Sequence, residues 1–232
     1  RALHTFNSAG EEFSAAAAQA SSHLGIVYMT LGKYSQAQEH LHRALSIRQA
    51  LHETSAEWIA ATYNDLGLVY SQTDKDKALD YYEQAAGMYA SLYSKQHPKI
   101  AIANINTGII YRDLGLFGDA VNNFEHALEI WEQVYPQPHP AKAIAYYNLG
   151  QTYLQLNDHE AAMQFYDQAL KMYGQCYGQR HPEIASVHNA IGNLQVAESN
   201  FDEALQSYQQ ERHYMESYLV VRAPQLYFLV IA

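Results

Sequence analysis

The stretch Leu149-Gly150-Gln151-Thr152-Tyr153, continued by Ala162, Tyr166 and Ala169, decides the fold because the chain repeats it at a fixed interval. Its glycine recurs at spacings of 42, 41, 42 and 42 residues, as Gly25, Gly67, Gly108, Gly150 and Gly192. The first alanine recurs in the same way, as Ala37, Ala78, Ala120, Ala162 and Ala204. Self-similarity at several positions with a period of roughly 20 to 50 residues indicates a stacked repeat array.

Each unit is predicted to be two helices joined by a short turn. In the second unit, a spacing of three or four residues marks one helical face, formed by Ile59, Tyr63, Leu66 and Tyr70. The second helix has the same spacing at Ala78, Tyr82, Ala85 and Tyr89. Three units contain a histidine–proline pair, at His97-Pro98, His139-Pro140 and His181-Pro182. Proline suits the first helical turn, where its missing N–H is not needed, so each pair is expected to open a helix.

The repeated glycines predict close crossings between helices. Glycine inside a helix costs about 1 kcal/mol relative to alanine. Five glycines at one register therefore indicate that two helix backbones approach closely there. We expect aromatic side chains to fill the space beside these small residues, namely Tyr28, Tyr70, Phe124 and Tyr166.

This pattern resembles the tetratricopeptide repeat (TPR), whose signature of Leu-Gly, Tyr, Ala, an aromatic residue and Ala is met in full between Leu149 and Ala169. The 42-residue period and the His-Pro pairs are similar to the kinesin-light-chain class of that family, as is the run Tyr177–Ala185. The resemblance implies an all-α fold. The expected architecture is a right-handed α-solenoid of tandem helix-turn-helix units, about five of them complete, with partial units at both ends.

One solenoid is expected over residues 1–232, because stacked repeats share a continuous core. The complete units are placed at 11–52, 53–94, 95–136, 137–178 and 179–220. A partial unit is expected at 1–10, and a partial unit or a cap at 221–232. Arg1-Ala2-Leu3 lies 42 residues before Arg43-Ala44-Leu45, and Arg222-Ala223-Pro224 lies 42 residues after Arg180-His181-Pro182. These offsets indicate a piece of a longer array, in which residues 225–232 begin another first helix; a short capping segment is the alternative.

The composition argues against several classes of function. The chain has 14 Lys and Arg against 24 Asp and Glu, a net charge of −10, whereas a nucleic-acid footprint needs clustered positive charge. No apolar run approaches the roughly 18 residues of a membrane span. The single cysteine, Cys176, excludes an intrachain disulfide and suits a cytoplasmic location.

We expect neither catalysis nor a cofactor or metal. His97, His139 and His181 recur with the repeat, so they should lie on the order of 10 Å apart, too far to share one zinc ion. They are interpreted as turn residues. Cys176 and His181 are separated by a turn and do not form a nucleophile–base pair. The sequence contains no P-loop, dinucleotide fingerprint or nucleophile elbow.

The resemblance also implies a concave groove, lined by the first helices, in which an extended peptide or a partner helix binds. Three stripes are expected to line it, three residues before, one after and four after each repeated glycine, on the face opposite the buried residues. The candidates are Ser22, Ile26, Met29, Asn64, Leu68, Ile105, Ile109, Arg112, Tyr147, Gln151, Leu154, Asn189 and Asn193.

Two kinds of contact are expected in the groove. Asn64, Asn189 and Asn193 could hold a peptide backbone, because an amide both donates and accepts; bonds within the array or to water are the alternative. Apolar pockets are expected at Leu68, Ile105, Ile109 and Leu154, and core packing is the alternative if the register is off by one residue.

Arg112 is the only base in the three stripes, so a clamp for a C-terminal carboxylate would lack its cations. The acidic balance favours neutral or basic partners. The sequence therefore predicts a non-catalytic protein–protein interaction module that acts as an adaptor or scaffold. One alternative is the sensing or regulatory arm of a larger enzyme, such as a protease or a ubiquitin-ligase receptor. Another is self-association through exposed solenoid ends.

Overall fold

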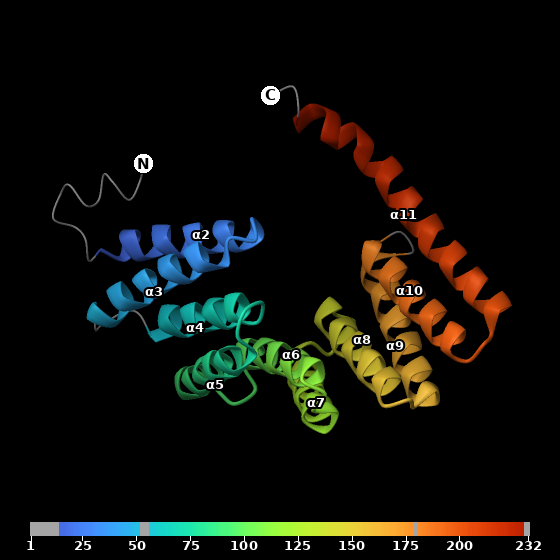
Figure 1. Ribbon diagram of the computed structural model, residues 1–232, viewed down its shortest axis with the longest axis horizontal. Coiled ribbons are helices and arrows are strands. Elements are labelled where there is room, and N and C mark those ends of the chain that lie inside the picture. Colours follow the sequence, from blue (N-terminus) through green and yellow to red (C-terminus); the bar gives the residue numbers. More distant parts are fainter. Residues whose placement is uncertain (1–13, 52–55, 179–180, 230–232) are drawn as a thin grey trace. The chain divides into compact units, whose positions relative to one another are not determined.

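The computed structural model describes residues 14–51, 56–178 and 181–229, with side chains described as far as Glu216. These residues form ten α-helices and no strand. The chain contains two compact units, Arg1–Ile130 and Trp131–Ala232. Figure 1 colours the first from blue to green and the second from yellow to red.

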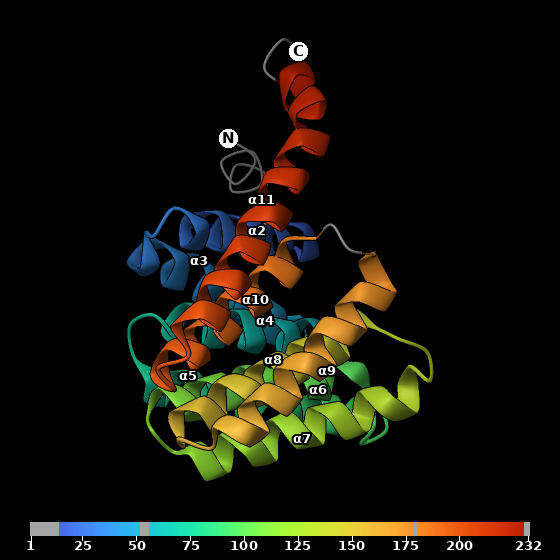
Figure 2. The same cartoon turned by 90° about the vertical axis from the view of Figure 1, so that its right-hand side faces the viewer.

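The first unit consists of consecutive helices packed in pairs. Its elements are α2 (Ala15–Thr30), α3 (Tyr34–Ala50), α4 (Ala56–Tyr70), α5 (Lys75–Leu92), α6 (Pro98–Asp113) and α7 (Phe117–Val134), the last of which extends past Ile130. Helix α2 packs on α3 and α4 on α5, and the pairs are joined by contacts of α3 with α4 and of α5 with α6. Figures 1 and 2 show these successive helices side by side. This arrangement confirms the expected helix-turn-helix units.

The second unit contains α8 (Pro140–Gln155), α9 (His159–Tyr177), α10 (Pro182–Ala197) and α11 (Phe201–Leu229). Helix α8 packs on α9 and α10 on α11, with α9 also against α10. Helix α11 runs without a break through Pro224 to Leu229, so it includes part of the segment 225–232, for which the sequence predicts the start of another first helix or a short cap. The partial unit expected at 1–10 lies outside the described residues.

The histidine–proline pairs open helices, as expected. Helices α6, α8 and α10 begin at Pro98, Pro140 and Pro182. In each pair the histidine Nδ1 accepts a hydrogen bond from the backbone N–H two residues later, at 3.3, 3.2 and 3.4 Å. Each imidazole also stacks on the tyrosine four residues before it, with ring centroids 4.0, 3.8 and 3.9 Å apart. The capping histidine satisfies a backbone donor that the start of a helix leaves unpaired.

The repeated glycines lie against the second helix of their own unit. A β-carbon at any of them would lie within 2.6 Å of one side chain, in the pairs Gly25–Leu41, Gly67–Tyr82, Gly108–Phe124, Gly150–Tyr166 and Gly192–Tyr208. The expectation was right for Phe124 and Tyr166 and wrong for Tyr28 and Tyr70. These two rings stack beside the crossing, on His40 and Tyr81, with centroids 5.2 and 5.3 Å apart. The tyrosine three residues after the glycine therefore packs on the residue that directly precedes the glycine's contact in the second helix.

Candidate functional site

The three expected stripes lie beside the packed face of each first helix, not opposite it. At about 100° per residue, positions three before, one after and four after the glycine stand roughly 60°, 100° and 40° away from it. Because the glycine faces the second helix, all three stripes border that interface. The stripe one residue after the glycine is the most open. In it, Ile26 and Leu68 each expose 39% of their surface, and Asn193 is also exposed.

Two candidates are buried and do not present their side chains to solvent. Ser22 exposes 5% of its surface and Ile105 exposes 6%. Both occupy the stripe three residues before the glycine, which turns toward the core. For Ile105 the core-packing alternative describes the structure, and the buried Ser22 likewise does not contribute to an open groove surface.

Three candidates in the first unit line one cavity. Ile26 and Met29 reach it from α2, and Leu68 reaches it from α4. Leu41 and Val69, both fully buried, and Asp65 complete the lining. The cavity has a volume of about 110 Å³. Ile26 and Leu68, at equivalent positions of two successive repeats, thus border one largely apolar space, and Asp65 is the one ionisable residue of its lining.

Asp65 is held in an environment that disfavours its charge. Burial raises the pKa of this carboxyl from 3.8 to about 6, and the positive charge of Arg48 lowers it by a smaller amount. Arg48 does not line the cavity. Its guanidinium donates to the backbone oxygen of Trp58 at 3.2 Å and to the hydroxyl of Thr62, and it lies over the Trp58 ring, 5.5 Å from the centroid. Perturbed carboxyl groups of this kind are concentrated at functional sites.

The remaining candidates of the first unit are half-buried. Asn64 accepts a hydrogen bond from Asn106 in the next repeat. The Nδ2 of Asn106 lies 3.1 Å from the Oδ1 of Asn64. This bond occupies the amide oxygen and leaves the two N–H donors of Asn64 without a partner among the described residues. Ile109 and Arg112 on α6 are also partly exposed.

In the second unit the candidate asparagines bond within the array. Asn189 donates to Glu211 at 2.9 Å and accepts from Asn193 at 3.2 Å. The Asn193 oxygen in turn accepts from the hydroxyl of Tyr208 at 2.8 Å. A peptide backbone would therefore have to displace existing bonds to reach Asn189, whereas Asn64 has donors to offer.

The other candidates of this unit pack against its core. Gln151 donates to the hydroxyl of Tyr147 at 2.6 Å. Tyr147 and Leu154 contact the apolar cluster built around Tyr166 and Tyr173. These three side chains are half-buried, so they contribute more to packing than to an open surface.

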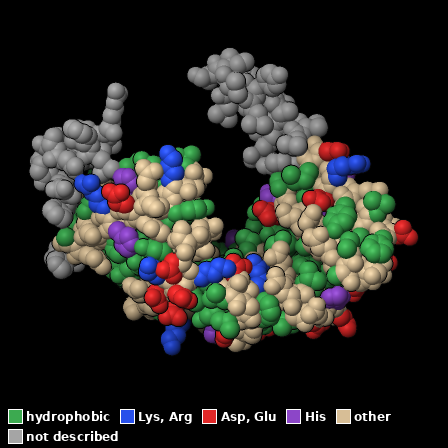
Figure 3. Space-filling view, in the orientation of Figure 1, with side chains coloured by type: hydrophobic (Ala, Val, Ile, Leu, Met, Phe, Trp, Pro, Cys, Tyr) green, Lys and Arg blue, Asp and Glu red, His purple; other side chains and the backbone are tan. Residues whose placement is uncertain are grey.

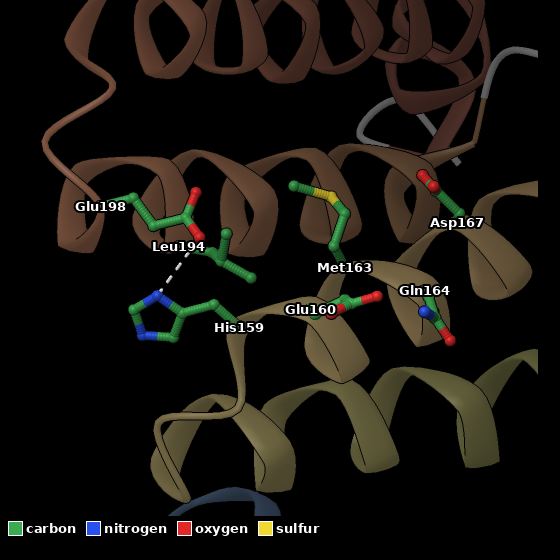
Figure 4. A pocket seen from close by; sticks show the side chains of 7 residues that line it. All are labelled: His159, Glu160, Met163, Gln164, Asp167, Leu194 and Glu198. Carbon is green, nitrogen blue, oxygen red and sulfur yellow. Dashed lines mark ion pairs between the residues drawn. The ribbon is translucent and has the colours of Figure 1, made fainter.

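A second cavity, of about 370 Å³, lies between α9 and α10 (Figure 4). His159 and Glu198 form an ion pair across it, with Nδ1 and Oε1 3.3 Å apart, when the imidazole is protonated. Met163 and Leu194 supply apolar surface, and the rest of the lining is Glu160, Gln164 and Asp167. This cavity is open, and none of the candidates from the three stripes lines it.

The charges on the described surface are mixed in sign. On the face shown in Figure 3, acidic and basic side chains alternate with apolar and uncharged ones. No group of three or more His, Cys, Asp and Glu side chains within the described residues is close enough to hold a metal ion. Cys176 is half-buried, and burial raises the pKa of its thiol. In the described part of the chain, no helix is long and apolar enough to cross a membrane.

Sequence reasoning missed Asp65, although a signal for it exists. The position two residues before each repeated glycine holds His23, Asp65, Asn106, Asn148 and Ala190. Asp65 is the only acid in that series and is followed directly by a core leucine, Leu66. An acid next to a core position of a helix is expected to be partly buried, and burial of a carboxylate is costly unless the charge is compensated.

A model of the tetratricopeptide repeat matches residues 16–91 and 99–175, which is well over half of the chain. The chain therefore belongs to the tetratricopeptide repeat family, as the resemblance implied. No curated protein sequence matches it.

Several solved structures share the fold. BtubC (BKLC) from P. vanneervenii is 22% identical, with a TM-score of 0.76 over 88% of this chain and 81% of that one. A kinesin-light-chain protein of Podosopora anserina, with nearly identical TPR-like repeats, is 19% identical, with a TM-score of 0.70 over 87% of this chain and 96% of that one.

A Rap protein solved in complex with the Competence and Sporulation Factor is 16% identical, with a TM-score of 0.72. The match covers 85% of this chain and 54% of that one, so the chain spans about half the length of the Rap protein. At these identities the similarities establish the fold.

Proposed function

We propose that this chain is a non-catalytic protein-interaction module, and that a peptide segment or a partner helix binds across the first helices of its first unit. The observation that carries the proposal is the cavity between α2 and α4. Three of the residues predicted from the repeat register, Ile26, Met29 and Leu68, line it together. Small-molecule and peptide sites combine such apolar pockets with a few polar groups that fix orientation.

Two further features support peptide binding at this face. Asn64 lies one helical turn before Leu68 on α4 and retains amide N–H donors suited to a peptide carbonyl. The exposed Ile26 and Leu68 side chains would each lose water contact on binding, a favourable change of about 25 cal/mol per Å² of apolar surface. Together these groups would hold a backbone and one side chain of an extended ligand.

The proposed role is that of an adaptor or scaffold in the cytoplasm, with neutral or basic protein partners. The net charge of −10 would steer such partners and repel strongly acidic ones. The presence of only one cysteine suits a reducing compartment. Binding of a factor by the Rap protein is a property of that protein, and it gives a precedent for a ligand on this fold.

A peptide array tests the proposal. The purified chain is applied to immobilised tiled peptides, and the affinity of the strongest binders is measured by fluorescence anisotropy. Leu68→Ser should weaken binding roughly 10- to 100-fold, because it removes one buried leucine from the interface. Leu92→Ser is the matched control, since Leu92 on α5 exposes 41% of its surface, close to the 39% of Leu68. Equal losses in both variants, or no loss in either, would contradict binding at this face.

A further inference from the structure

The shape and lining of the cavity in the first unit indicate which side chain of a ligand it binds. This inference rests on the proposed function. We propose that it is a subsite for a lysine side chain of the bound peptide. The alkyl stem would lie among Ile26, Met29 and Leu68, and the terminal ammonium would meet the carboxylate of Asp65.

The size of the cavity favours a slim chain over a ring. Its volume is about 110 Å³, smaller than the roughly 150 Å³ of an engineered apolar cavity that takes up benzene. An aromatic anchor is therefore too large to enter it fully. A four-carbon stem fits the space, and lysine carries its charge at the end of such a stem.

The position of Asp65 favours a positive end group. The other five residues of the lining are apolar and offer no side-chain partner for a charge. A cation that enters such a space has to meet an anion there, because burying an isolated charge is strongly unfavourable. The same carboxylate would repel a glutamate or aspartate of a ligand, so the subsite discriminates by sign as well as by shape.

Arg48 does not already fill this role. Its guanidinium bonds to Trp58 and Thr62, which precede Asp65 on α4, and Arg48 is not among the residues that line the cavity. Its charge lowers the pKa of Asp65, but burial outweighs that effect. The carboxylate is thus incompletely compensated, and a ligand ammonium would improve its environment.

A pair of small probes tests the chemistry of the subsite directly. n-Butylammonium and n-butanol share the alkyl chain and differ in charge, and each is titrated into protein carrying a ¹³C-labelled methyl group on Met29. We expect n-butylammonium to perturb the Met29 signal at roughly tenfold lower concentration than n-butanol. Asp65→Asn, which keeps the shape, should abolish that preference. Asp80→Asn, which removes a carboxylate from an exposed position of α5, should leave it unchanged.

Three outcomes would overturn the inference: equal response to both probes, a preference that survives Asp65→Asn, or no perturbation of Met29 by either.

A second experiment uses the strongest array peptide with each lysine replaced in turn by norleucine, arginine or glutamate. We expect one lysine whose replacement by norleucine weakens binding to the wild type roughly tenfold and to Asp65→Asn not at all. A peptide that depends on Leu68 but on no lysine would refute the lysine subsite and leave the proposed function standing. Absence of any Leu68-dependent peptide would refute the proposed function, while the probe titration still decides the chemistry of the cavity.

Discussion

The ring of Tyr166 lies so close to Gly150 that a β-carbon at Gly150 would come within 2.6 Å of its Cδ1 and Cε1 atoms. Tyr166 is fully buried, so its ring has no open space into which to move. We predict that Gly150→Ala destabilises the second unit by roughly 1 to 3 kcal/mol, the usual cost of overpacking a core. Urea denaturation followed by circular dichroism measures the change.

Gly174→Ala is the matched control for this prediction. Gly174 lies in α9 of the same unit, and a β-carbon there would meet nothing within 4 Å. Helix propensity then acts alone and should stabilise the protein by up to about 1 kcal/mol. Equal effects of the two substitutions would show that the glycine–tyrosine crossing does not constrain the packing.

A second prediction concerns the contribution of the histidine cap of α8 to stability. His139 accepts from the backbone N–H of Ala141 and stacks on Tyr135 with a centroid distance of 3.8 Å. His139→Ala removes both contacts and should cost roughly 1 to 2 kcal/mol of unfolding free energy. His139→Asn restores a capping acceptor without the ring, so its cost should be intermediate.

Thermal and urea unfolding of these two variants and of His126→Ala measure the effect. His126 is an exposed residue within α7, and its replacement should be nearly neutral. If the alanine and asparagine variants at position 139 lose the same stability, the hydrogen bond contributes nothing and the stack alone supports the turn.

The buried carboxyl of Asp65 predicts a pH-dependent stability. Its pKa is about 6 in the folded protein against an ordinary value of 3.8. Folding therefore favours the protonated form, and this stabilisation is complete below about pH 4 and is lost as the pH rises through about 6. The shift corresponds to at most about 3 kcal/mol, and the water-exposed part of Asp65 makes the actual value smaller.

Asp65→Asn cannot ionise, so it should be more stable than the wild type at about pH 7.5 and nearly equal to it at about pH 3. The midpoint of urea unfolding at the two pH values measures the difference. Asp80→Asn, at an exposed position, should give the same small change at both. A destabilised Asp65→Asn at the higher pH would mean that the attraction to Arg48 outweighs burial.

The sequence predicts the helices well because the signals that start and join them are local. A histidine that caps and a proline that fits the first turn lie within three residues of each other, so the starts of α6, α8 and α10 follow directly. The continuation of α11 through Pro224 was not predicted. The repeat register alone does not show whether α11 ends before Pro224.

The site was predicted only in part because exposure depends on neighbouring repeats. Three of the residues that the register groups, Ile26, Met29 and Leu68, line one cavity, since equivalent positions of adjacent repeats lie side by side. The register does not predict that Ile105 is buried. Ile105 lies three residues before Gly108, only about 60° around the helix from the glycine face that packs on the second helix. The environment of Asp65 depends on residues of α2 and α3 that are distant in sequence, so the acid beside the core residue Leu66 marks the position without showing which residues bury it.

Methyl NMR of the first unit's face tests the central claim most directly. The chain, labelled with ¹³C in the methyl groups of isoleucine, leucine and methionine, is titrated with the strongest peptide from the array. We predict that the signals of Ile26, Met29 and Leu68 shift together and saturably, whereas those of Leu92 and Ile102, both exposed elsewhere on the unit, stay in place. Shifts confined to other methyl groups, with these three unchanged, would contradict binding at this face.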